Sequence, residues 1–220
     1  MTNVPRAQPA LAGAKPPIVA SLRDAANLLT LAGVFSSLLA IIFAFNGRLS
    51  AASVALVAAF IFDVVDGPVA KRLSGRNDDD RAIGANLDSL ADVVSAGVAL
   101  SVVFLAYADF EAAFVPGAFL LVGAATLRLA YFNVHGLAET STTYTGLPTD
   151  LAIILFVTVV LLDQPLTRSA FQIVLYGAVV VLAGLMVSSL RVPKFTGRAF
   201  WAVLGLAVCL AAAHAAIAFS

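Results

Sequence analysis

Four aspartates stand in two neighbouring apolar stretches of the chain. Asp63 and Asp66 are three residues apart, and Asp88 and Asp92 are four residues apart, so each pair lies on one face of a helix. A charged group inside a membrane span costs about 2.5–3.5 kcal/mol on insertion scales, and such groups usually mark a site or a pathway. Both pairs lie at a similar depth, about 12–14 Å from the loop that joins them. The spacing therefore predicts one polar pocket that contains all four.

Carboxylates held this close together repel one another and take up protons unless cations neutralise them. Oxygen ligands without histidine or cysteine are typical of sites for Mg²⁺, Mn²⁺ or Ca²⁺, and two divalent cations would offset the charge of the cluster. Two such ions can polarise a phosphoryl group and stabilise the phosphate that leaves. We therefore expect a two-metal catalytic site formed by Asp63, Asp66, Asp88 and Asp92.

Two other interpretations of the aspartates stay open at this point. They could pair with basic side chains such as Lys71, Arg72 or Arg128 and only hold helices together. They could also line the substrate pathway of a cation transporter, because intramembrane carboxylates serve that purpose as well. The residues around the aspartates are needed to decide between an enzyme and a transporter.

Small residues next to the aspartates favour an enzyme that uses a nucleotide. Gly67 directly follows Asp66, and Ala70 lies on the same side one turn later. Without large side chains there, a flat nucleotide could approach the metals closely. Gly84, which we expect to open the next helix, would leave similar room. A transporter has no need of such a gap.

The composition predicts that the elements carrying these residues are membrane spans. Of the 220 residues, 61% are hydrophobic and only 12% are charged, and the mean hydropathy is +0.98, far from the composition of a soluble domain. We predict an all-α, polytopic transmembrane bundle of about six to seven spans in one domain over residues 25–220, the fifth candidate span being the shortest. The candidate spans are Ala25 to Phe45, Ala52 to Arg72, Ala85 to Tyr107, Ala113 to Val134, Pro148 to Asp163, Ala170 to Leu190 and Ala199 to Phe219.

The segment before the first span, residues 1–24, is predicted to be a disordered tail followed by a short interfacial segment from Ile18 to Asp24. Basic residues gather on the side of the membrane that carries this segment. They fall in the tail, in the loop after the second span and in the loop before the last span, whereas Arg48 and Arg168 alone face the other side. The positive-inside rule then places the N-terminus and the aspartate pocket toward the cytoplasm, and we expect the protein in the plasma membrane. The run NDDDR at residues 77–81 is predicted to be a solvated part of the second loop.

The segment from Asp63 to Asp92, DVVDGPVAKRLSGRNDDDRAIGANLDSLAD, resembles the signature of the CDP-alcohol phosphotransferase family. That signature reads D-x-x-D-G-x-x-A-R, followed by G-x-x-x-D-x-x-x-D, and every fixed position but one matches. Lys71 stands where the family has arginine, and the connection from Lys71 to Gly84 is longer than usual. Within the family, LDSLADVVSAGVA, LRLAYFNV and GLPT are similar to segments of bacterial phosphatidylserine synthases, although Tyr131 stands where those often carry a second arginine.

The resemblance implies a role for each matching residue. Asp63, Asp66 and Asp88 would bind two metal ions, and Asp92 would both face the metals and act as the general base. Arg128, at a depth similar to that of the aspartates, and Arg72 are our candidates for binding the carboxylate or phosphate of the acceptor. The nucleotide would lie among Asn27, Thr30, Gly67, Ala70, Lys71 and Gly84.

The reaction implied by the resemblance is the transfer of a phosphatidyl group from CDP-diacylglycerol to the hydroxyl of serine, which yields phosphatidylserine and CMP. Inositol phosphate, glycerol phosphate or choline could replace serine as the acceptor, and the cation transporter is the alternative of another class. The resemblance also implies a homodimer. Membrane lipid is the expected environment, and we expect no nucleic-acid partner.

Overall fold

The computed structural model describes residues 17–135 and 143–219, so the predicted disordered tail lies outside the described residues. Six helices in this part of the chain are long and apolar enough to cross a membrane, and the only sheet described is a short pair of strands. The predicted all-α, polytopic bundle is therefore confirmed. The six spanning helices are Ala25–Phe45, Leu49–Arg72, Asp78–Ala106, Ala112–His135, Arg168–Met186 and Arg198–Phe219.

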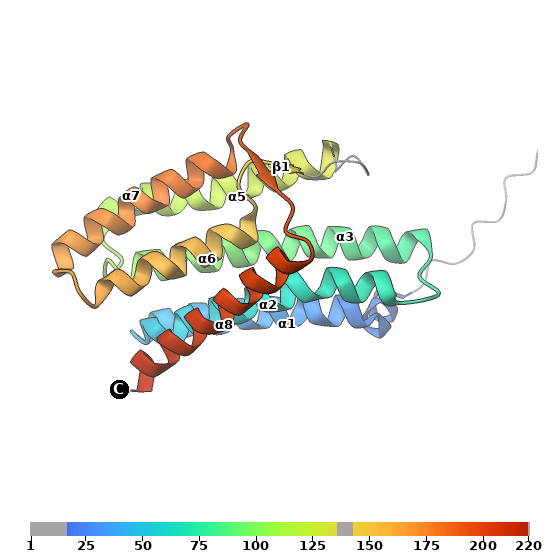
Figure 1. Ribbon diagram of the computed structural model, residues 1–220, viewed down its shortest axis with the longest axis horizontal. Coiled ribbons are helices and arrows are strands. Elements are labelled where there is room, and N and C mark those ends of the chain that lie inside the picture. Colours follow the sequence, from blue (N-terminus) through green and yellow to red (C-terminus); the bar gives the residue numbers. More distant parts are fainter. Residues whose placement is uncertain (1–16, 136–142, 220) are drawn as a thin grey trace, which may run out of the picture.

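The helices run back and forth along one direction (Figure 1). In chain order, the elements are η1 (Ile18–Arg23), α1 (Ala25–Phe45), α2 (Leu49–Arg72), α3 (Asp78–Asp92), η2 (Val93–Ala99), α4 (Leu100–Ala106), η3 (Ala112–Phe114), α5 (Val115–His135), β1 (Thr143–Thr145), α6 (Thr149–Val160), η4 (Leu161–Asp163), α7 (Arg168–Met186), β2 (Arg191–Pro193) and α8 (Arg198–Phe219). The η1 helix and the α2–α3 connection lie at one end, the strand pair lies nearer the middle of the bundle, and the C-terminus lies at the other end (Figure 1).

The predicted interfacial segment forms η1, a short 3₁₀ helix whose apolar side chains stay outside the bundle. Ile18 is 93% exposed, and Val19 and Leu22 are exposed as well. Asp24 then caps α1, because its carboxylate accepts a hydrogen bond from the backbone N–H of Ala26 at 2.9 Å. Apolar residues next to a basic, capped helix start are suited to the boundary between water and lipid.

The α3 helix begins earlier than the sequence predicted. Asn77 and Asp80 form a capping box, in which each side chain accepts a hydrogen bond from the other residue's backbone N–H, at 2.8 and 3.1 Å. The charged run at 77–81 is solvated, as predicted, but it forms the start of a helix rather than a loop. Acidic residues suit that position because they face the positive end of the helix dipole. Gly84 consequently lies inside α3 and does not open it.

The backbone changes its winding directly after Asp92. The residues of η2 form a π-helix, which continues into α4 as one spanning segment. A π segment inserts extra residues into a turn and shifts the helix faces, and it often occurs beside a functional site. Gly97 of η2 packs closely on α5, where a Cβ at that position would lie 3.6 Å from the Cβ of Ala125. Close packing of small residues is how helices commonly associate in membranes.

The fifth candidate span forms at nearly the bounds predicted for it, and it is the shortest, as expected. It forms only the 12-residue helix α6 and the single turn η4, and it is not among the six helices long enough to span. The strand β1, which pairs with β2, and the turn at Gly146 come just before α6 in the chain. The N–H groups of Gly146 and Leu147 donate to the carbonyls of Leu190 and Leu185 at 2.8 and 2.9 Å. These contacts fix the start of α6 inside the bundle, where it packs against α2 and α7.

Replacing Gly146 by alanine should destabilise the protein. Gly146 has a φ of +73°, and a Cβ there would lie 2.3 Å from the carbonyl oxygen of Met186. The left-handed backbone alone costs a residue with a Cβ about 1–2 kcal/mol, so the melting temperature of the purified protein should fall by at least about 2–4 °C. Gly184→Ala is the control, because nothing lies within 4 Å of that position, and it should not lower the melting temperature. Equal melting temperatures for the two variants would contradict the conclusion that the backbone at position 146 requires glycine.

Candidate active site

Three of the predicted aspartates come together between α2 and α3. Asp63 and Asp66 of α2 and Asp88 of α3 each place one carboxylate oxygen within 4.8 Å of the other two. The Thr30 hydroxyl of α1 donates a hydrogen bond to the buried Asp66 carboxylate. A set of three carboxylate oxygens at this spacing fits the ligand chemistry of a hard divalent cation. The donor set therefore agrees with the predicted metal chemistry.

Asp92 lies beside these three aspartates and is held by a different helix. The Thr149 hydroxyl, at the start of α6, donates to Oδ2 of Asp92 at 2.8 Å. This bond occupies one carboxylate oxygen and fixes the orientation of the other, which can then accept a proton from a reacting group. Thr149 is the first residue of α6 and is buried, so the start of this helix brings its hydroxyl to Asp92.

A cavity of about 400 Å³ contains all four predicted aspartates, and we call it the acidic cavity. A fifth carboxylate, that of Asp150 in the first turn of α6, also lines it. Three cationic side chains face the same space: Lys71 of α2, Arg128 of α5 and Lys194 of the β2–α8 connection. The predicted pocket for four aspartates therefore exists, and it holds one more acid than predicted.

A second cavity, also of about 400 Å³, lies on the other side of the aspartates between α1, α2 and α3. It has three cationic side chains, Lys71, Arg76 and Arg81, so we call it the basic cavity. Its other walls are formed largely by small residues, namely Ala26, Gly67, Ala70, Gly84 and Ala85. Small walls beside positive charges suit a planar base that carries phosphates.

The six residues predicted to hold a nucleotide all line the basic cavity: Asn27, Thr30, Gly67, Ala70, Lys71 and Gly84. Gly67 faces open space, because a Cβ there would meet nothing within 4 Å. Gly84 has a different environment, since a Cβ at that position would lie 2.6 Å from Nη2 of Arg76. The expected gap at Gly67 is thus present, whereas the room at Gly84 is taken by an arginine.

The two predicted acceptor-binding arginines lie in different places. Arg128 is 9% exposed and lines the acidic cavity together with a neighbouring cavity of about 320 Å³. Its Nε has no hydrogen-bond partner within the described part of the chain. Arg72 is exposed at the end of α2 and lines neither the acidic nor the basic cavity. The structure therefore brings Arg128, and not Arg72, to the aspartates.

The sequence analysis missed Thr149 and Asp150, although both line the acidic cavity. Asp150 lines the acidic cavity together with Asp63, Asp92 and Arg128. A signal was present, because Asp150 is an ionisable residue at the start of an apolar stretch, as the other aspartates are. Arg76 was counted only as a basic loop residue, and its place in the basic cavity depends on how the loop folds.

Comparison with known proteins gives a match over most of the chain. The sequence profile described as CDP-alcohol phosphatidyltransferase matches residues 23–189. The chain belongs to the CDP-alcohol phosphatidyltransferase family. This assignment confirms the resemblance of the Asp63 to Asp92 segment and the expectation of an enzyme that makes phospholipids. It also favours the enzyme over the cation-transporter alternative.

Several relatives are similar over about three quarters of the chain. A CDP-diacylglycerol–serine O-phosphatidyltransferase of Helicobacter pylori (strain J99) is 33% identical over 175 residues, which are 77% of this chain and 71% of that protein. An archaetidylserine synthase of Methanothermobacter thermautotrophicus is 33% identical over 172 residues, 78% of this chain and 70% of that protein. A CDP-diacylglycerol–serine O-phosphatidyltransferase of Methanocaldococcus jannaschii is 33% identical over 156 residues, 70% of this chain and 69% of that protein.

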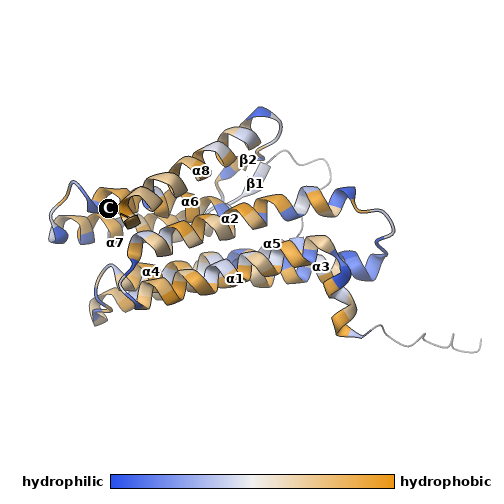
Figure 2. Cartoon of the chain, turned by 90° about the horizontal axis from the view of Figure 1, so that it is seen from below, coloured by the Kyte–Doolittle hydropathy of each residue, from blue (hydrophilic) through white to orange (hydrophobic). Residues whose placement is uncertain are grey.

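The part of the chain after the family match also contributes to the site. The α8 helix packs along α2, as Figure 2 shows from a second direction. Phe200 and Val203 of α8 line the acidic cavity with Lys194.

Removing the Thr149 hydroxyl should slow turnover without unfolding the enzyme. In Thr149→Val the Asp92 carboxylate loses its donor at 2.8 Å, and a hydrogen bond to a charged group is worth about 1.5–3 kcal/mol. The expected loss in kcat for CMP release is roughly 10- to 100-fold, with the KM for the CDP-lipid nearly unchanged. Thr158→Val is the matched control on the same helix, because its hydroxyl bonds only to the Ile154 carbonyl. Equal turnover in both variants would show that Asp92 does not need Thr149.

Proposed function

We propose that this protein transfers a phosphatidyl group from CDP-diacylglycerol to the hydroxyl of serine and releases CMP. Family membership supports the phosphatidyl transfer. Two of the relatives above are named for CDP-diacylglycerol and serine, and a third is named for making archaetidylserine. The names of the relatives support serine as the acceptor, and the cavities support a reaction between two separately bound substrates.

The observation that carries this proposal is that the two cavities meet at the aspartates. Asp66, Gly67, Lys71 and Asp88 line both the acidic and the basic cavity. A nucleotide in the basic cavity would therefore extend its phosphates toward the aspartates, while an acceptor in the acidic cavity would approach the same point from the other side. Two substrates placed on opposite sides of one reacting atom gain the advantage of proximity and orientation.

The chain's own residues account for the proton and for binding. Asp92, oriented by Thr149, would take the proton from the serine hydroxyl. The serine oxygen would then form a bond to the phosphorus that carries diacylglycerol, and the bond from that phosphorus to the CMP oxygen would break. The unpartnered Nε of Arg128 makes this side chain a candidate to bind the serine carboxylate.

Asp63, Asp66 and Asp88 are the residues that would hold divalent cations, with Asp92 beside them. When bound, such ions neutralise the carboxylates and stabilise the negative charge on the phosphates during transfer. We propose two ions, either Mg²⁺ or Mn²⁺, with Ca²⁺ as the third candidate. The oxygen-only ligand set supports this choice over softer metals.

We further propose that the enzyme lies in the plasma membrane with both cavities open toward the cytoplasm. Lys71, Arg76 and Arg81, which lie around the α2–α3 connection, line the basic cavity, and the positive-inside rule assigns a basic connection of this kind to the cytoplasm. We also propose a homodimer and a single transmembrane domain over residues 25–220, preceded by the tail and interfacial segment at residues 1–24.

Release of CMP from CDP-diacylglycerol should depend on serine and on a divalent cation. Purified protein with Mg²⁺ or Mn²⁺ should release CMP faster with serine than with inositol phosphate, glycerol phosphate or choline. EDTA should abolish the release, and excess metal should restore it. Faster release of CMP with another alcohol would identify that alcohol as the acceptor in place of serine. Activity that EDTA does not affect would contradict the metal site. Cation uptake into liposomes without CDP-lipid, with no CMP release, would support a transporter instead.

Asp92→Asn should leave a folded protein that binds CDP-diacylglycerol but turns over very slowly. An amide cannot take the proton from the acceptor, and general base catalysis contributes about 10²- to 10⁴-fold. Asp79→Asn is the control, because Asp79 is an exposed aspartate in the first turn of the same helix segment and should keep full activity. Retained turnover in Asp92→Asn would remove Asp92 as the base.

A further inference from the structure

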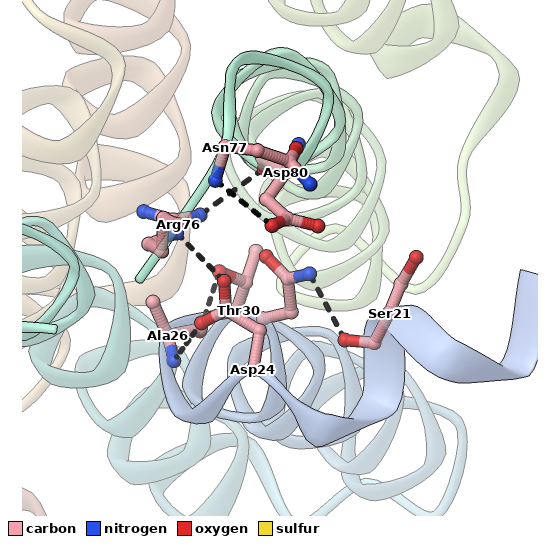
Figure 3. A network of polar contacts seen from close by, with 8 residues as sticks. Ser21, Asp24, Ala26, Thr30, Arg76, Asn77 and Asp80 are labelled. Atoms are coloured by element: carbon pink, nitrogen blue, oxygen red, sulfur yellow. Dashed lines mark hydrogen bonds and ion pairs between the residues drawn. The ribbon is translucent and has the colours of Figure 1, made fainter. Parts of the chain in front are cut away.

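Arg76 stands in the connection between α2 and α3, but its side chain turns back into the bundle. The side chain is only 13% exposed, and its Nε lies 2.7 Å from Oδ2 of Asp24, the residue that caps α1. Its Nη2 donates to the backbone carbonyl of Asp80 at 3.3 Å. Figure 3 shows the guanidinium between the start of α1 and the start of α3. A loop arginine is therefore held at a defined place by two other elements.

The place that Arg76 occupies is a wall of the basic cavity. Nη2 of Arg76 lies 2.6 Å from where a Cβ at position 84 would be, so the guanidinium fills the space that only a glycine there leaves free. Asp66 and Asp88, two of the three clustered aspartates, line the same cavity. The guanidinium therefore shares the basic cavity with the aspartates at which the two cavities meet.

A purely structural role does not account for this arrangement. The capping box of Asn77 and Asp80 already fixes the start of α3 without Arg76. A buried ion pair such as that of Arg76 and Asp24 adds little net stability, because both charges lose their hydration. The two contacts also use only part of the guanidinium's fork of N–H donors. The remaining donors are available to an anion in the cavity that Arg76 lines.

We propose that Arg76 binds the pyrophosphate of the CDP-lipid and that Asp24 positions it for this contact. The inference rests on the function proposed above and adds a binding residue to it. Lys71 offers the phosphates a single compact charge, whereas a guanidinium presents paired donors that match phosphate oxygens. Two cations of different geometry would then hold the diphosphate, with Lys71 on α2 and Arg76 on the connection.

The test compares the inhibition of the enzyme by CDP with its inhibition by cytidine, which lacks the phosphates. Arg76→Ala should raise the KM for CDP-diacylglycerol and the inhibition constant of CDP by about 10- to 100-fold, as expected for a lost charged hydrogen bond. The inhibition constant of cytidine should stay within about twofold, because the base keeps its walls. Arg23→Ala is the control, because Arg23 is an exposed cation next to Asp24 that lines neither cavity. It should change none of these values.

A double-mutant cycle with Asp24→Ala distinguishes a direct contact of Arg76 with CDP from a role that is limited to its ion pair with Asp24. If Arg76 served only its ion pair with Asp24, each single variant and the double variant would have the same effect. We expect instead that Asp24→Ala raises the inhibition constant of CDP less than Arg76→Ala does. Equal effects in all three variants, or equal weakening of CDP and cytidine, would overturn the proposal. A fall in kcat alone would overturn it as well.

Two further measurements keep the proposal testable. If Arg76→Ala does not fold, Arg76→Lys can be tested, because it retains the charge and loses the paired donors of the guanidinium. It should weaken the binding of CDP several-fold and leave the binding of cytidine unchanged. Direct calorimetric titration of CDP into the Mg²⁺-loaded protein needs no turnover, so it tests Arg76 even if serine is not the acceptor. Wild-type protein that binds CDP but releases no CMP with serine would contradict the proposed reaction alone. Unchanged CDP affinity in both Arg76 variants would contradict the inference alone.

Discussion

Five aspartates share one cavity inside a bundle whose helices are otherwise largely apolar, and their mutual repulsion sets the arrangement around them. Each contact that relieves this repulsion comes from a different helix. Thr30 of α1 donates to Asp66, Thr149 of α6 donates to Asp92, and Arg128 of α5 brings a positive charge into the same space. The bundle is therefore organised around the acids, and cations in the cavity would complete the balance of charge.

The irregular parts of the backbone gather around the same cavity. Pro68 follows Gly67 inside α2, so the carbonyl one turn earlier, at Val64, loses its helical donor, and Val64 lines the acidic cavity. The π segment η2 begins right after Asp92, and α6 begins inside the bundle after the turn at Gly146. In lipid, a backbone group without a partner is costly, whereas beside a polar cavity it can be satisfied. The cavity thus permits the irregular backbone that shapes it.

Helical periodicity explains why much of the site could be predicted from the sequence. The spacings of Asp63 with Asp66 and of Asp88 with Asp92 place each pair on one face, and the short connection between α2 and α3 forces the two faces together. Thr149 and Asp150 belong to a helix far along the chain, and their depth depends on a β1–β2 pairing that has no local signal. The π segment depends on packing against α5 in the same way. The run at 77–81 was misassigned because its charges suggested a loop, although Asn77 followed three residues later by Asp80 is a visible helix start.

The charged side chains of the two cavities bear on where each substrate binds. The acidic cavity holds five carboxylates and three cationic side chains, and the two divalent cations proposed there would more than offset the negative charge. Serine carries an ammonium group that carboxylates attract and a single carboxylate that Arg128 can bind. The basic cavity, with Lys71, Arg76 and Arg81, suits the diphosphate of the CDP-lipid instead. We therefore infer that the cations of the basic cavity direct the diphosphate to one side of the aspartates, and that Arg128 gives the carboxylate of serine a partner on the other side.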